Sequence, residues 1–107
     1  MALTDKNLVV EQPNLDGTQR LYRFADGHGL SLINAPMAHS FRFAWEAAVL
    51  GGIKKDGTGG RIQYATPLTN DVEVFQTDAE ANAFIAKARA IFDKKRMRRG
   101  AAERGLP

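Results

Sequence analysis

Three Asp-Gly dipeptides separate short apolar segments of this chain, and this feature constrains the fold more than any other. The dipeptides stand at residues 16–17, 26–27 and 56–57. Asp-Gly is a strong signal for a tight β-hairpin because it adopts positive φ angles at little cost. Turns of this kind join neighbouring antiparallel strands, so the spacing predicts a meander.

The segments around the second dipeptide form the clearest hairpin. Residues 19–25 alternate between two faces, and residues 28–34 follow the turn with a second apolar run. A shorter strand is expected at residues 8–10, ended by Pro13, which cannot donate a ladder hydrogen bond. Two more short strands are expected at residues 61–65 and 71–75.

Residues 41–50 show the longest apolar alternation. Every second position is apolar, at Phe41, Phe43, Trp45, Ala47 and Val49. This pattern predicts the core strand, with Trp45 at the centre of the core. A helix is the alternative, because the segment is rich in alanine and Ser40 could cap it. The alternation and the Gly51-Gly52 stop favour the strand.

A helix is expected from about residue 78 to about residue 98. Thr77 and Glu80 form a capping box, in which each side chain satisfies a backbone donor of the first turn. An apolar stripe follows at three- and four-residue spacing: Ala81, Phe84, Ile85, Ala88, Ile91 and Phe92. Gly100 is the expected stop.

Together these elements predict an α+β fold, in which an antiparallel meander sheet of about four or five strands carries one long C-terminal helix packed on one face. The 107 residues fit one domain, and 44% hydrophobic and 25% charged residues are typical of a folded protein. We expect a single domain over residues 1–99 and a short basic tail over residues 100–107.

Charge is distributed unevenly along the chain. Residues 1–86 hold seven basic and ten acidic side chains, a net charge of −3, whereas residues 87–107 hold eight basic and two acidic ones, a net charge of +6. The densest basic cluster comprises Lys94, Lys95, Arg96, Arg98 and Arg99. Such a cluster favours binding to phosphates or to an acidic protein face, and the alternative is a solvated helix end whose cations offset the helix dipole.

Catalytic and metal chemistry has weak support. The chain has no cysteine, and His28 and His39 lack the spacing of metal ligands on one helix face, so we expect no metal and no cofactor. The loop at residues 57–60 lacks the Gly-Lys-Ser/Thr ending of a phosphate-binding loop. An enzyme would depend on His28, His39 and Glu46 alone, and we expect none.

A second basic region could bind single-stranded nucleic acid. Arg20, Arg23 and Arg42 alternate with tyrosine and phenylalanine along two expected strands. Within each strand the aromatics fall opposite the nearest arginine, which favours a core role for the aromatics instead. The chain also lacks an apolar run near membrane-spanning length and a signal peptide pattern, so a cytoplasmic location without membrane contact is expected.

Several motifs in residues 20–75 occur in one order: Leu21-Tyr22-Arg23-Phe24, Asp26-Gly27-His28-Gly29, Trp45-Glu46-Ala47-Ala48-Val49-Leu50 and Thr66-Pro67-Leu68-Thr69-Asn70-Asp71-Val72. This order resembles a group of small accessory proteins encoded by bacteriophages and prophages. Asp26 replaces the usual asparagine of the first turn, and Ala47 replaces a leucine. The resemblance implies a cytoplasmic role in an infected bacterium and no particular activity.

Two functions follow from these observations. The first is a non-enzymatic phage-type accessory or anti-defence protein that binds and occupies a host protein or a protein–nucleic-acid complex. The alternative is a nucleic-acid-binding accessory protein that uses the basic helix end. In both cases the predicted partner-binding residues are the basic cluster defined above, and the oligomeric state stays open.

Overall fold

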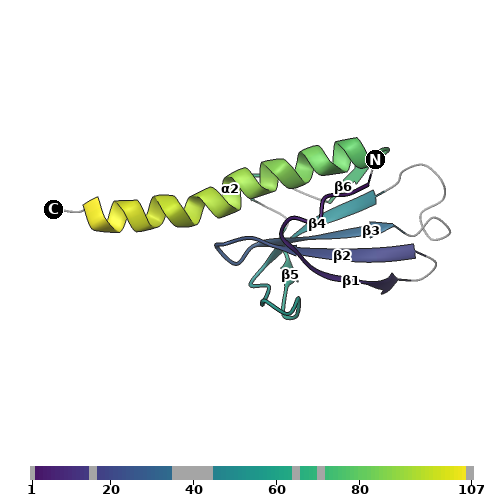
Figure 1. Cartoon of the computed structure of the whole chain (residues 1–107), viewed down its shortest axis with the longest axis horizontal. Helices are drawn as coiled ribbons and strands as arrows, with labels where there is room; N and C mark the ends of the chain where they lie inside the picture. The colour runs from purple at the N-terminus through teal and green to yellow at the C-terminus, as the bar shows by residue number, and fades with distance from the viewer. Residues whose placement is uncertain (1, 15–16, 35–44, 64–65, 70–71, 106–107) are drawn as a thin grey trace.

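The structure is a computed structural model, and it describes residues 2–14, 17–34, 45–63, 66–69 and 72–105, with side chains described up to residue 93. Its strands run in the order β1-β2-β3-β4-β5, with β6 also paired to β4, and every pair is antiparallel. One C-terminal helix, α2, follows the sheet (Figure 1). The predicted α+β fold with an antiparallel meander is therefore confirmed.

The central hairpin joins β2 (Gly17–Arg23) to β3 (Gly29–Asn34), and it too is confirmed. Phe24 N donates to His28 O at 2.8 Å, which closes the turn between the strands. Gly27 has a φ of 93°, the conformation for which the Asp-Gly signal selects glycine. Local sequence thus fixes the register of the strands at the middle of the sheet.

The first strand is longer than predicted. β1 spans Leu8–Asn14 and passes through Pro13, which lies opposite Thr18 of β2. The prediction that Pro13 ends this strand is wrong, because β1 lies at the edge of the sheet. An edge strand pairs on one side only and therefore tolerates a residue without an N–H.

The strand predicted over residues 41–50 is present as β4, which spans Trp45–Gly51 and is not helical. Residues 41–44 lie outside the described part of the chain. Two short strands share the outer side of β4, namely β5 (Arg61–Ile62) and β6 (Glu73–Phe75). Both are shorter than expected from residues 61–65 and 71–75, parts of which also lie outside the described residues.

The helix α2 spans Asp78–Gly105. Its predicted capping box is present: Glu80 N donates to Thr77 Oγ1 at 3.1 Å, and Thr77 N donates to Glu80 Oε1 at 3.2 Å. The predicted stop at Gly100 is wrong, because the helix continues for five more residues. A glycine inside a helix costs only about 1 kcal/mol relative to alanine, and the two alanines that follow are strong helix formers.

One hydrophobic cluster contains buried residues of both the sheet and α2. The helix contributes the predicted stripe, with Ala81, Phe84, Ile85, Ala88 and Phe92 buried and Ile91 partly buried. Trp45 belongs to this cluster but is not its most buried member. It is 9% exposed, whereas Tyr22, Phe24 and Phe92 are fully buried.

A smaller cluster occupies the opposite face of the sheet. Leu21 of β2 and Leu50 of β4 pack with Ile53 there, against Val9 and Val10. The loop after β4 covers this cluster closely, since a Cβ at Gly57 would lie 2.4 Å from Val10 Cγ2. Gly57 also has a φ of 89°, so two independent constraints require glycine at this position.

Candidate functional site: the C-terminal part of the helix

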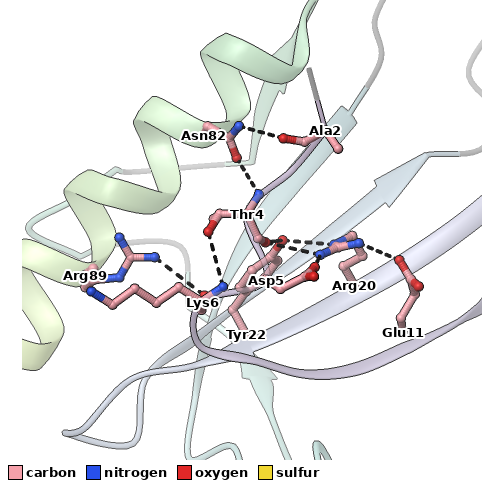
Figure 2. Close-up of polar contacts among 9 residues, drawn as sticks. All are labelled: Ala2, Thr4, Asp5, Lys6, Glu11, Arg20, Tyr22, Asn82 and Arg89. Atoms are coloured by element: carbon pink, nitrogen blue, oxygen red, sulfur yellow. Dashed lines mark hydrogen bonds and ion pairs between the residues drawn. The ribbon is translucent and has the colours of Figure 1, made fainter.

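The helix is attached to the N-terminal segment at its first turns. The Asn82 side chain accepts a hydrogen bond from Thr4 N at 2.9 Å and donates one to Ala2 O at 3.0 Å (Figure 2). Leu3, between these two residues, is buried in the core. Residues 2–4 therefore link the start of α2 to the sheet.

A second attachment lies about two turns further along the helix. Arg89 Nε donates to Asn7 Oδ1 at 2.8 Å, and Asn7 Nδ2 donates to Arg23 O at 3.0 Å. Asn7 has a φ of 72°, a conformation that asparagine tolerates better than most residues. The side chain of Asn7 thus connects α2 to the end of β2.

Arg20 of β2 attaches the N-terminal segment to the sheet. It is 9% exposed, and its guanidinium donates to Tyr22 Oη at 2.9 Å, to Thr4 O at 3.1 Å, to Glu11 Oε2 at 2.5 Å and to Asp5 (Figure 2). Burial acts to lower the pKa of Arg20, but its hydrogen bonds to Tyr22 and Asp5 outweigh that effect and raise the pKa. Burial also raises the pKa of Tyr22, against the opposing effect of Arg20.

This arrangement bears on the basic and aromatic face, which the sequence allowed but disfavoured. Arg20 lies two residues before Tyr22 and therefore shares its face, where both are buried. Arg23 Nε donates to Ile53 O at 2.8 Å on the opposite face, and Arg42 lies outside the described residues. Arg20 and Arg23 thus do not form one surface for stacking bases.

The turn between β2 and β3 holds α2 at residues 92–93. His28 Nδ1 lies 3.0 Å from Asp26 Oδ2, and the His28 ring stacks on Phe92 with centroids 4.2 Å apart. Asp93 Oδ1 accepts a hydrogen bond from Ala25 N at 2.6 Å. His28 therefore has a structural role in this turn, whereas His39 and Ser40 lie outside the described residues.

Beyond these contacts α2 continues over residues 94–105, which we call the basic arm. At about 1.5 Å per residue this arm is about 18 Å long. Figure 1 shows that it extends past the sheet, and none of the described strands lies beside it. The basic arm holds six basic residues and one acidic residue, and all five predicted partner-binding residues belong to it.

The sequence changes character where the arm begins. Lys95 and Arg99 follow Ala88 and Phe92 by seven residues, so they occupy the positions that would continue the buried stripe. Positions seven apart lie close to the same side of a helix. The stripe therefore becomes basic at the point where α2 leaves the sheet. A helix that packs on its own domain along its whole length would keep an apolar stripe to its end.

Other kinds of site lack support within the described part of the chain. It contains no group of three histidine, cysteine, aspartate or glutamate residues placed to hold a metal ion. Glu46 is partly buried on β4 and lines a groove of about 380 Å³ on the sheet face opposite the main core. In the same residues no helix is long and apolar enough to span a membrane.

Comparison with known proteins found no matching family model, no match among curated proteins and no match among solved structures. The resemblance to phage-encoded accessory proteins therefore stays a prediction. The attachment of α2 to the N-terminal segment by Asn82 and Arg89 is not visible in the sequence, because Asn82 lies 80 residues from Ala2 and Arg89 lies 82 residues from Asn7. The bonding of Arg20 to the same N-terminal segment is not visible either, because no local motif indicates it.

Proposed function

We propose that this protein is a small non-enzymatic accessory protein that binds and occupies a macromolecule of a bacterial host. In this proposal α2 has two parts, of which residues 78–93 cover one face of the sheet and the basic arm contacts the partner. The cytoplasm of an infected bacterium is the proposed location, as the resemblance to phage proteins implies. The observation that carries the proposal is the continuation of α2 past the sheet as a basic helix.

The charge of the basic arm supports a partner with an acidic surface. Its net charge is +5, on a body whose residues 1–86 have a net charge of −3. Clustered cations accelerate association with an acidic partner and favour it over basic ones. The leading candidate is a host protein, or a protein–nucleic-acid complex, with an acidic face.

The contacts of α2 support a rigid presentation of this surface. Asn82, Arg89 and Phe92 fix three successive parts of the helix to the N-terminal segment and to the β2–β3 turn. All three contacts precede the basic arm, so they set the direction in which the arm leaves the sheet and reduce the orientational freedom lost on binding, which favours affinity. The sheet then serves as the base from which the arm extends.

Nucleic acid is the second candidate, and one observation favours it. The five clustered cations fall at five of the six positions from 94 to 99, so on a helix of 3.6 residues per turn they spread around more than half of its circumference. A helix that lies in a groove between two phosphate backbones uses cations on both sides. Among these six residues only Met97 supplies an apolar side chain for a protein interface.

Capture of partners from bacterial lysate tests this proposal. The bait is the full chain, and the matched controls are the variant with all five clustered cations changed to alanine and the variant Lys54→Ala/Lys55→Ala, which changes exposed loop lysines. We expect the wild type and the loop variant to retain a partner that the five-alanine variant loses. Retention by the folded five-alanine variant would overturn the proposal.

Nuclease treatment and salt separate the two candidates. A partner that is captured equally after nuclease treatment is a protein. If the partner is nucleic acid, the logarithm of the affinity falls linearly with the logarithm of the salt concentration, with a slope of about −0.9 per phosphate contacted in duplex DNA.

A further inference from the structure

A second charged feature lies at the other end of α2. Residues 71–80 hold four acidic residues and no basic one, a net charge of −4, and two of the four, Glu73 and Glu80, line a groove. This groove of about 370 Å³ runs between β6 and the first turns of α2. We call it the acidic groove.

The acidic groove combines an apolar floor with carboxylates. Leu68, Phe75 and Phe84 supply the apolar part, and the rings of Phe75 and Phe84 lie 5.1 Å apart. Glu73 and Glu80 line the same groove, together with Ala83 and Lys87, so the lining itself has a net charge of −1. One oxygen of each carboxylate already accepts a hydrogen bond, from Thr69 or from the backbone of residues 76 and 77, and the other oxygen is the one that a cation would meet. An occupant with cationic groups on partly apolar stems, such as lysine or arginine, matches this chemistry.

The chain carries such an occupant in its basic arm. The arm cannot fold back into the groove of its own chain, because both features lie on one continuous helix and the arm extends away from the sheet (Figure 1). A second copy meets no such restriction. We therefore propose that the chain associates with itself, with the basic arm of one copy lying in the acidic groove of another.

This contact joins two different surfaces of the chain. It rests on the proposed function only because both use the basic arm, and it adds a way to regulate partner binding. While the arm lies in the groove of another copy it is not available to the partner, so self-association competes with partner binding. Dilution and salt release the arm, because contacts between opposite charges weaken as salt screens them.

Two arginine substitutions on the same helix test the groove. Ala83 and Ala86 are both exposed residues of α2, but only Ala83 lines the groove. Ala83→Arg places a like charge where the arm is proposed to lie, whereas Ala86→Arg adds the same charge outside it. In sedimentation equilibrium at about 50 mM salt, Ala83→Arg should self-associate at least about tenfold more weakly than the wild type, and Ala86→Arg should associate like the wild type. Raising the salt to about 500 mM should abolish the association of the wild type.

Mixing two defective variants then tests the arm-to-groove pairing directly. Ala83→Arg keeps its arm, and the five-alanine variant keeps its groove, so each should be monomeric alone while an equimolar mixture forms a 1:1 complex. A mixture that stays monomeric, or an Ala83→Arg variant that associates like the wild type, overturns the contact.

The same samples keep this inference separate from the proposed function. Partner capture by Ala83→Arg should match or exceed that of the wild type, because its arm is intact and released. If the five-alanine variant loses self-association but still captures the partner, the proposed function fails while the contact stands. If Ala83→Arg associates normally and the five-alanine variant loses the partner, the contact fails while the proposed function stands.

Discussion

The His28 ring lies nearly flat on the Phe92 ring, with their planes 12° apart and their centroids separated by 4.2 Å. His28 belongs to the β2–β3 turn, and Phe92 is the last buried residue of the core stripe among the described side chains of α2. The stacked pair therefore marks the point at which the helix leaves the body and the basic arm begins.

The stacked rings should be energetically coupled. A double-mutant cycle of His28→Ala and Phe92→Leu should give a coupling free energy of about 0.5–1.5 kcal/mol, the range for aromatic pairs. Urea unfolding followed by circular dichroism measures it. The control cycle pairs His28→Ala with Phe84→Leu, whose ring packs on Phe75 instead, and should give a coupling near zero. Equal coupling in both cycles would contradict a specific stack.

Trp45 should contribute strongly to stability, because its side chain is buried in the main core and its Nε1 donates to Asp78 Oδ1 at 2.7 Å. Trp45→Ala should lower the free energy of unfolding by about 3–5 kcal/mol. Trp45→Phe keeps an aromatic ring but removes the hydrogen bond, so its loss should be smaller. Chemical denaturation of both variants checks this, and a loss below about 0.5 kcal/mol in Trp45→Ala would contradict the burial.

Tyr22 should make stability depend on pH at the alkaline end. Its ordinary pKa is 10.0, and the folded state raises it, so above about pH 10 the unfolded chain loses this proton more readily than the folded one. The free energy of unfolding should therefore be unaffected by this group below about pH 10 and fall as the pH rises through the folded pKa. Tyr22→Phe should show a shallower alkaline decline in unfolding experiments, and an unchanged decline would contradict the assignment.

Asn82 should protect the N-terminal segment. Asn82→Ala removes the acceptor for Thr4 N and the donor to Ala2 O, so amide hydrogen exchange at Thr4 should accelerate. The amide of Leu8, which donates to Asp5 O, serves as the internal control and should change less. Equal acceleration at both amides would indicate general destabilisation and not loss of a local attachment.

The sequence patterns were most informative where one short segment decides the structure. The turn at residues 26–27 and the capping box of Thr77 and Glu80 are local, and both formed as expected. The prediction at Pro13 is wrong because the tolerance of proline in a strand depends on whether that strand lies at the sheet edge, which no local pattern reveals. The prediction at Gly100 is wrong because a single glycine is a weak helix stop when good helix formers follow it.

The candidate site is visible in the sequence only where a local pattern reveals it. The basic cluster is visible in the sequence as a run of like charges, whereas its placement on a helix that extends past the sheet depends on where the sheet ends. The burial of Arg20 cannot be predicted from the sequence, because it requires Thr4, Asp5 and Glu11 to converge on its guanidinium. Sequence alone also could not identify the acidic groove, which forms only when β6 packs beside α2.

The most direct test of the central claim is the affinity of the captured partner for the five-alanine variant at low salt. The variant Lys54→Ala/Lys55→Ala controls for loss of charge elsewhere, and thermal unfolding verifies that both variants fold. If the basic arm binds the partner, the five-alanine variant should bind at least about tenfold more weakly than the wild type, while the loop variant stays close to it. Wild-type affinity in a folded five-alanine variant would contradict the claim and leave the arm as a solubilising end of the helix.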